Sequence, residues 1–348
     1  MTATYGRDIV TVAASAGGLE PLRTLLAGLP ADLPASVLIV LHIPATGGRT
    51  LPRILDRAGV LPAAAAVDGE QLQAGRVYVA PPDLHLLVVD GLVRTSRGPR
   101  QNGVRPSADP LFRSAALYGG PRTTGVVLSG TLDDGALGAA AVEQCGGYVI
   151  VQDPDDAAYD SMPRCALATT RHSEIQPAGK IARLLNRLTR EEVEVSPGEP
   201  PAALEAEVRA LLAGDPQIAP PPRDYSGFTC PECGGPLYHV PEHSADSYDC
   251  LVGHRWSPEA LLEEQTSTVE RAMWLAVRSL DERRRLTGRL AEVARSRGRP
   301  LSAAHFRAAS EEAALAADAI RGATSKMTPV TEEPVAGQLT PGEAGIGG

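Results

Sequence analysis

The first 190 residues repeat one pattern, a short apolar run followed by a break rich in glycine or proline and then a helical run. The runs predict strands near 8–14, 36–42, 76–80, 85–90, 124–129 and 147–151, and helices near 19–28, 50–58, 109–118, 135–145 and 178–190. This alternation predicts an α/β fold with a mainly parallel, doubly wound sheet and helices on both faces. Residues 84–89 and 92–96, joined by Asp90-Gly91, instead predict a hairpin at the sheet margin.

Length and composition narrow the class of protein. At 348 residues the chain exceeds one typical domain, and 43% hydrophobic content is enough for a sizeable core. A net charge of −9 argues against general nucleic-acid binding. The apolar runs have strand length, and the start of the chain lacks the basic and apolar order of a signal peptide. We therefore expect a cytoplasmic protein without membrane insertion.

Three predicted strand ends carry residues with catalytic potential. Ser15 follows the run 9–14 and precedes a glycine pair and a helix, His42 follows 37–41, and Asp134 follows the run 124–129. Catalytic groups of open α/β sheets gather beyond the carboxyl ends of the strands, so a Ser-His-Asp triad is expected. Each residue also has a plainer interpretation: a helix cap or phosphate contact for the serine, a satisfied polar residue at the sheet rim for the histidine, and a turn for the Asp-Asp-Gly.

Several separated segments together resemble one known family. They are Ala14-Ser15-Ala16-Gly17-Gly18, Leu41-His42-Ile43-Pro44, the segments 78–85 and 105–112, Gly125-Val126-Val127-Leu128-Ser129-Gly130, Asp134-Gly135-Ala136 and Met162-Pro163. From about Asp8 to Val193 the chain resembles the catalytic domain of the chemotaxis protein-glutamate methylesterase family, CheB. The resemblance implies Ser15 as nucleophile, His42 as base and Asp134, rather than its neighbour Asp133, as the orienting acid. It also places Arg105, Ser107 and Asp109 near the site.

The resemblance implies hydrolysis of glutamyl methyl esters on a chemoreceptor or other signalling protein, without a cofactor for catalysis. Deamidation of glutamine would use the same acyl-enzyme. Backbone N–H groups near Ala16 and Thr131 would hold the oxyanion. Two residues depart from the family pattern: Ala16 stands where threonine is usual, and Leu132 where glycine is usual.

Two other functions stay open. One is a non-catalytic regulatory module that docks partners on the esterase fold, and the other is a small-molecule serine esterase. Typical members carry an N-terminal phospho-receiver domain, whereas seven residues precede the first predicted strand here. A stand-alone form without a receiver domain is therefore expected.

A second module is predicted after a proline-rich linker at 194–224, which brackets a helical stretch at 202–213. Cys230, Cys233, Cys250 and His254 form the pattern C-x2-C-x16-C-x3-H within residues 225–258. Three thiolates and one imidazole complete a tetrahedron, so the pattern predicts a structural zinc site. His239 and His243 are alternative fourth ligands, and a disulfide is the alternative to metal. The segment also resembles the C-terminal zinc ribbons of some methylesterase homologues.

The remaining residues predict a helical hairpin and a tail. Ser257 and Pro258 have the cap and first-turn pattern of a helix start. Apolar residues then recur at alternating spacings of four and three, and a second helix is predicted over 303–320. The hairpin, 259–322, is expected to pack internally or to form a homodimer. The tail, 323–348, has few apolar residues and is expected to be disordered.

Overall fold

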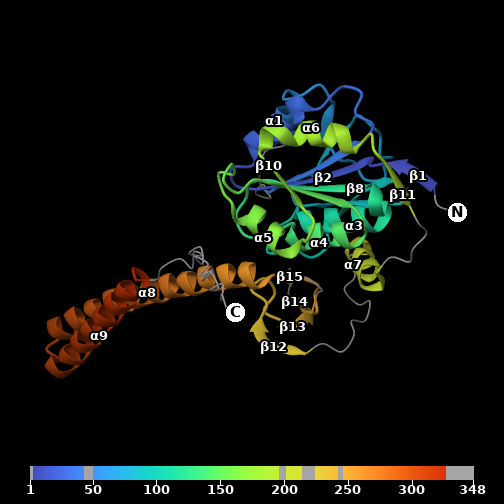
Figure 1. Cartoon of the computed structure of the whole chain (residues 1–348). Coiled ribbons are helices and arrows are strands. Elements are labelled where there is room, and N and C mark those ends of the chain that lie inside the picture. Colours follow the sequence, from blue (N-terminus) through green and yellow to red (C-terminus); the bar gives the residue numbers. More distant parts are fainter. Residues whose placement is uncertain (1–2, 43–49, 196–200, 214–223, 242–245, 327–348) are drawn as a thin grey trace, which may run out of the picture. The chain divides into compact units, whose positions relative to one another are not determined.

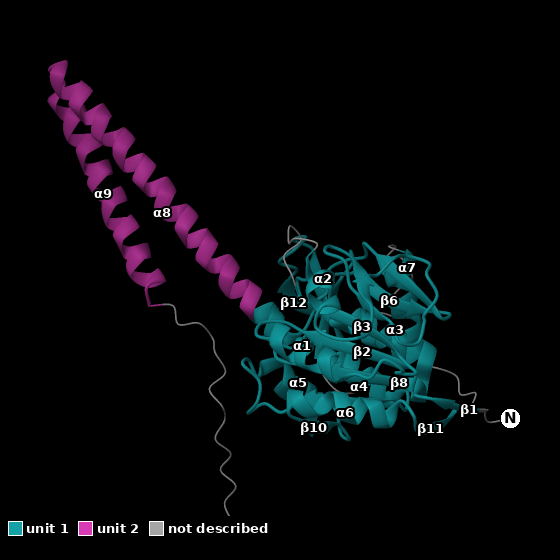
Figure 2. Cartoon of the chain, turned by 90° about the horizontal axis from the view of Figure 1, so that it is seen from above, with its two compact units in different colours: residues 1–262 teal, residues 263–348 magenta. Residues whose placement is uncertain are grey.

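The computed structural model describes residues 3–42, 50–195, 201–213, 224–241 and 246–326. The chain divides into two compact units, residues 1–262 and residues 263–348 (Figure 2). The first unit contains the predicted esterase and zinc modules, and the second contains most of the helical hairpin.

A seven-stranded sheet forms the centre of the first unit (Figure 1). Its order is β10-β9-β8-β2-β3-β5-β4, and every pair is parallel. The strands are β2 Ile9–Ala14, β3 Ser36–Leu41, β4 Ala63–Ala65, β5 Val77–Val79, β8 Thr123–Val127, β9 Tyr148–Gln152 and β10 Glu174–Gln176. All residues of β2, β3 and β8 are buried, as expected for strands covered on both faces.

Helices cover both faces of this sheet, which confirms the predicted doubly wound α/β fold (Figure 1). One face is covered by α1 Leu19–Gly28, α2 Leu51–Asp56 and α6 Ala178–Leu188. The other is covered by α3 Ala108–Gly119, α4 Ala136–Gln144 and α5 Ser161–Thr169, and the 3-10 turn Gly120–Arg122 links α3 to β8. Each layer encloses its own apolar core, built mainly from aliphatic side chains.

Two antiparallel pairs lie at the margins. The predicted hairpin is present as β6 His85–Val89 and β7 Leu92–Ser96. Its turn residues Asp90 and Gly91 have φ of 52° and 77°, and two-residue turns of this kind need positive φ at both positions. The second pair, β1 Ala3–Gly6 with β11 Glu192–Val195, was not predicted.

The segment after β11 also packs on the first unit. Helix α7 Ala202–Ala213 corresponds to the predicted helical stretch, and its buried Leu204 belongs to the core around α3. The Ser96 hydroxyl donates to the Leu211 carbonyl. The other parts of the predicted linker, 196–200 and 214–223, lie outside the described residues.

The predicted zinc module is a small antiparallel sheet, which we call the ribbon. Its strands are β12 Tyr225–Thr229, β13 Pro236–Pro241, β14 Asp246–Cys250 and β15 Arg255–Trp256, hydrogen bonded in that order. Cys230, Leu237, Cys250 and Trp256 form its own core together with Ala260 and Leu261.

The helical hairpin consists of α8 Pro258–Ser296 and α9 Pro300–Thr324. An ion pair between Arg321 and Asp281 links the two helices at 2.5 Å, and the Ser310 hydroxyl donates to the Arg284 carbonyl at 3.0 Å. Among the described residues, no helix has both the length and the apolar character needed to span a bilayer. Helix α9 extends to Thr324, into the tail predicted as disordered over 323–348, and the tail from residue 327 onward lies outside the described residues.

Candidate active site

The three predicted catalytic residues follow neighbouring strands. Ser15 follows β2, His42 follows β3, and Asp134 lies in the loop between β8 and α4, with β2 between the other two strands. The Ser15 amide donates to the Ser129 carbonyl at 3.0 Å, which joins the ends of β2 and β8. The His42 amide donates to the Ala14 carbonyl at 3.1 Å. The chain adds strands to one side of β2 and later to the other, so these residues lie at a topological switch point.

His42 and Asp134 are in direct contact. The Nε2 atom of His42 lies 2.6 Å from Oδ2 of Asp134, and the two side chains are 16% and 3% exposed. Within the described part of the chain, no hydrogen bond joins the Ser15 hydroxyl to His42. The structure therefore pairs the predicted base and acid, with the half-buried serine at the adjacent strand end.

The N-terminus of α3 holds the carboxylate of Asp134. Its Oδ1 accepts from the Ser107 hydroxyl at 2.6 Å and from the Asp109 amide at 3.2 Å, and its Oδ2 accepts from the Ala108 amide at 2.6 Å. Burial raises the pKa of Asp134, but the hydrogen bonds and the charge of His42 outweigh burial, so the pKa lies below its usual value. Asp134 is thus an ionised, fully engaged carboxylate.

Asp133, the neighbouring candidate, lies in a different environment. Its side chain is 6% exposed, and its Oδ1 has no hydrogen-bond partner among the described residues. Burial, together with the charges of Asp109, Glu259 and Asp134, raises the pKa of Asp133 to about 7, although the Ser257 side chain acts to lower it. The geometry therefore favours Asp134 over Asp133 as the partner of His42.

The predicted oxyanion groups lie on the turns after β2 and β8. Within the described part of the chain, the N–H groups of Ala16 and Thr131 donate to no carbonyl or side chain. The Ser129 hydroxyl donates to the Ala16 carbonyl at 2.9 Å and accepts from the Tyr159 amide at 3.0 Å, which ties the two turns together. Leu132 adopts a left-handed backbone with φ of 61°, a conformation that glycine adopts more readily than leucine.

His85 supports the site, although no sequence pattern indicated a separate role for it. Its Nδ1 accepts from the Ser107 amide at 3.3 Å, and its Nε2 lies 3.0 Å from the Pro99 carbonyl. Burial lowers the pKa of His85 to about 4, so the ring is neutral near pH 7 and donates to Pro99 through Nε2. His85 thereby orients the residue that holds Asp134. A histidine at the start of a buried strand was the only sequence signal for this contact.

Arg105, expected near the site, bonds to Asp83 and to the 97–98 backbone, and its charge helps to lower the pKa of His85. Its Nε and Nη2 atoms donate to Oδ1 of Asp83 at 3.0 and 2.7 Å, and its Nη1 donates to the Gly98 carbonyl at 2.8 Å. These bonds lower the pKa of Asp83. Among the described contacts of Arg105, none is with Ser15, His42 or Asp134.

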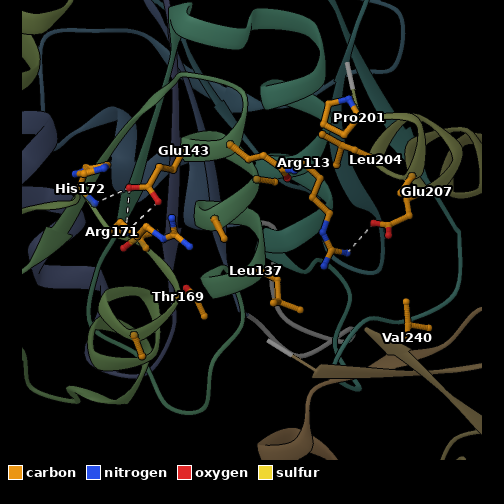
Figure 3. A pocket seen from close by; sticks show the side chains of 16 residues that line it. Arg113, Leu137, Glu143, Thr169, Arg171, His172, Pro201, Leu204, Glu207 and Val240 are labelled. Carbon is orange, nitrogen blue, oxygen red and sulfur yellow. Dashed lines mark hydrogen bonds and ion pairs between the residues drawn. The ribbon is translucent and has the colours of Figure 1, made fainter. Parts of the chain in front are cut away.

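A cavity of about 640 Å³ lies away from these residues, between α4, α5, α7 and β13 (Figure 3). Arg113, Leu137, Glu143, Arg171, Glu207 and Val240 are among the residues that line it. None of Ser15, His42 and Asp134 contributes to its wall. The cavity marks the junction of the α/β layers with α7 and the ribbon rather than the candidate active site.

The four predicted metal ligands come together at one end of the ribbon. The ligand atoms of Cys230, Cys233, Cys250 and His254 all lie within 4.8 Å of one another. His254 Nδ1 lies 3.8 Å from Cys230 Sγ and 3.5 Å from Cys250 Sγ, and the Cys233 and Cys250 sulfurs are 3.6 Å apart. Tetrahedral zinc separates such ligand atoms by roughly 3.6–3.8 Å, whereas a disulfide needs about 2.05 Å. The cluster therefore fits a metal ion.

The alternative fourth ligands are not part of this cluster. His239 Nε2 pairs with Asp246 Oδ1 at 2.9 Å, and His243 lies outside the described residues. His254 is the histidine of the described ribbon whose ring nitrogen faces the three sulfurs.

A family model described as CheB methylesterase matches residues 10–185. A solved structure, the CheB methylesterase catalytic domain of Thermotoga maritima, is 32% identical, with a TM-score of 0.50, and covers 52% of this chain and 98% of that one. A protein of Leptospira interrogans, provisionally named as a protein-glutamate methylesterase/protein-glutamine glutaminase, is 36% identical over 54% of this chain and 97% of its own length.

Longer relatives match over part of their length. A protein-glutamate methylesterase/protein-glutamine glutaminase of Symbiobacterium thermophilum is 36% identical over 52% of this chain, and the chain spans 50% of that protein. One of Anaeromyxobacter dehalogenans is 45% identical over 46% of this chain and 47% of its own length. The residues matched by the family model, 10–185, hold Ser15, His42 and Asp134 and make up half of the chain, and on this ground the chain belongs to the CheB methylesterase family.

Proposed function

We propose that the chain is a serine hydrolase that acts as a protein-glutamate methylesterase, with protein-glutamine deamidation as a second activity. The observation that carries the proposal is the 2.6 Å contact of His42 with Asp134 at the strand end next to Ser15. The names of the relatives support the choice of substrate, because they combine these two activities. The proposed substrate is a methylated glutamate side chain of a chemoreceptor or another signalling protein.

In the acylation step, Ser15 Oγ attacks the carbonyl carbon of the glutamyl methyl ester. The His42 Nε2–H donates to Asp134, so Nδ1 carries the lone pair that accepts the serine proton. The imidazolium then gives this proton to the departing methoxide, which leaves as methanol. The product is an ester between Ser15 and the glutamyl side chain.

In the deacylation step, His42 Nδ1 takes a proton from water as the water attacks the acyl-enzyme carbonyl. The proton returns to Ser15 Oγ as the ester bond breaks, which releases a free glutamate carboxylate. Asp134 orients the imidazole in both steps and stabilises its cationic form. The N–H groups of Ala16 and Thr131 are the proposed donors to the oxyanion. With a glutamine substrate the acyl-enzyme is the same, and ammonia leaves instead of methanol.

Zinc is the proposed occupant of the Cys230, Cys233, Cys250 and His254 cluster, and its proposed role is structural. Four protein ligands would saturate a tetrahedral ion and leave no open position for substrate or water. The bound ion would hold together a module whose apolar core contains few residues.

Turnover of a methylated receptor-type peptide tests the proposed function. We expect the wild-type chain to release methanol, and Ser15→Ala and His42→Ala each to lower the rate by several orders of magnitude. An aryl ester serves as the comparison substrate. If the wild-type chain hydrolyses the aryl ester but not the peptide, it is a small-molecule esterase. If the folded wild-type chain hydrolyses neither substrate, it is a docking module.

A further inference from the structure

The ribbon packs on the segment that leads to the residues holding Asp134. The Asn102 amide donates to the Arg255 carbonyl at 2.8 Å, and the Asn102 side chain accepts from the Ser257 amide at 2.9 Å. The ring of Trp256 is 2% exposed, and it lies 3.2 Å from the position that a Cβ of Gly103 would occupy. Residues 101–103 thus extend the ribbon at β15, four residues before Ser107.

A charge network, in which Arg113 and Arg255 are buried and Glu207 is partly exposed, makes a second connection. Glu207 of α7 pairs with Arg113 of α3 at 3.5 Å and with Arg255 of β15 at 2.9 Å (Figure 3 shows the first pair). Arg255 also pairs with Asp249 through two hydrogen bonds of 2.7 and 2.9 Å. Removing one partner from such a network leaves a buried charge, so the network favours one fixed position of the ribbon on α3. This is the helix whose N-terminus binds Asp134.

The third connection reaches the loop of Asp134 itself. The Ser257 side chain lies beside the buried carboxyl of Asp133, which immediately precedes Asp134, and acts to lower the pKa of that carboxyl. The Ser257 hydroxyl accepts from the Ala260 amide at 3.1 Å and so caps α8. Leu132, one residue earlier in the loop, has a left-handed backbone. A bulky residue keeps that conformation only where its surroundings hold it.

We propose that Ser257 is a positioning residue for the catalytic acid, and that the docked ribbon holds the 130–135 loop so that Asp134 stays paired with His42. The inference rests on the proposed function. It assigns the ribbon a role inside the hydrolase, because its contacts converge on Asp134 through Ser107 on one side and Asp133 on the other. Loss of the Ser257 contact lets the loop relax, which lowers kcat with little change in KM.

The test uses the full-length, zinc-loaded protein with Trp274→Phe. The chain has two tryptophans, so the fluorescence of this variant comes from Trp256, which lies in the ribbon core and against Gly103. We expect Ser257→Ala to lower kcat about tenfold with KM within about twofold. Ser257→Asp keeps the helix cap but opposes Asp133 with a carboxylate, so we expect at least the same loss. Ser257→Thr restores the rate. Ser279→Ala, a matched change on the exposed face of α8, leaves the rate unchanged.

A second measurement, also made on the Trp274→Phe protein, needs no substitution of Ser257. On removal of zinc by a chelator, we expect Trp256 emission to shift to longer wavelength, and amide hydrogen exchange in residues 130–135 to accelerate in parallel. A shift of Trp256 emission without faster exchange in this loop would overturn the inference. So would wild-type kcat in both Ser257→Ala and Ser257→Asp.

Results that reject the role of Ser257 differ from results that reject the proposed hydrolase function. If turnover depends on Ser15 but not on Ser257, the proposed function stands and the inference is wrong. If Ser15→Ala retains full turnover, the proposed function is wrong, and the role of Ser257 in catalysis is rejected with it.

Discussion

Asp109 and Asp134 cap each other's helices. Asp134 accepts from the Ala108 and Asp109 amides at the start of α3, and Asp109 Oδ1 accepts from the Gly135 and Gly138 amides at the start of α4, at 3.1 and 2.6 Å. Helix N-termini stabilise negative charge, so two acids can remain close together in a buried site. This mutual capping fixes the orientation of the Asp134 carboxylate, which faces His42.

Asp109→Ala removes both amide contacts from α4. We expect the free energy of unfolding to fall by about 1–3 kcal/mol, because two buried N–H groups lose their acceptor. Hydrolysis should fall as well, because Asp134 lies one residue before Gly135. Asp109→Asn keeps an oxygen at this position and is the matched control. Denaturant unfolding of both variants checks the prediction, and equal stability of Asp109→Ala and wild type would contradict it.

Asp133 makes stability depend on pH. Its pKa is raised from 3.8 to about 7, first by burial and then by the charges of Asp109, Glu259 and Asp134. A raised carboxyl pKa contributes stability below about pH 4, and this contribution is lost as the pH rises to about 7. Asp133→Asn removes the titration, so we expect its stability relative to wild type to improve by up to about 4 kcal/mol between pH 4 and 8. Unfolding curves at several pH values test this, and parallel pH profiles of the two proteins would rule it out.

Gly130 has no room for a side chain. A Cβ there would lie 2.0 Å from Met162 Sδ and 2.8 Å from Ser15 Cβ. We expect Gly130→Ala to displace Ser15 and to reduce hydrolysis at least tenfold. Gly179→Ala is the control, because Gly179 is an exposed position of α6 with nothing within 4 Å of its Cβ position, and the change should add about 0.5–1 kcal/mol to stability. Comparable rates for the two variants would show that the turn tolerates the added methyl group.

Metal binding should depend on the four clustered residues and on no other cysteine. We expect one equivalent of zinc per chain, and Cys233→Ser to lose it together with the folded ribbon. Cys165→Ser, outside the cluster, should keep the metal. Metal analysis combined with circular dichroism checks this outcome, and a folded ribbon in the metal-free wild-type protein would contradict it.

The central part of the fold could be predicted from the sequence because each of its strands and turns is marked by a pattern within a few consecutive residues. Fully apolar runs of strand length marked β2, β3 and β8, and Asp90-Gly91 marked the hairpin turn. The pair β1 and β11 was missed because it is exposed and joins the two ends of the α/β region. Helix α5 was missed as well, since Pro163 lies in its first turn and made the segment resemble a loop.

Parts of the candidate site could not be predicted because they depend on long-range contacts. The positions of Ser15, His42 and Asp134 at strand ends predicted that they lie together, but the mutual capping of Asp109 and Asp134 joins the start of α3 to a loop 25 residues later. The contact of Ser257 with Asp133 spans the α/β region and the ribbon. No spacing rule predicts such a contact, because it follows from how the modules pack.

Covalent labelling of Ser15 tests the central claim most directly. A fluorophosphonate probe should react with Ser15 of the full-length chain, and mass spectrometry of the digested protein should find the adduct on this serine alone. His42→Ala should label much more slowly, because the base that activates the serine is absent. Attachment of the probe to a different serine, or equally fast labelling of Ser15 in His42→Ala, would contradict the account.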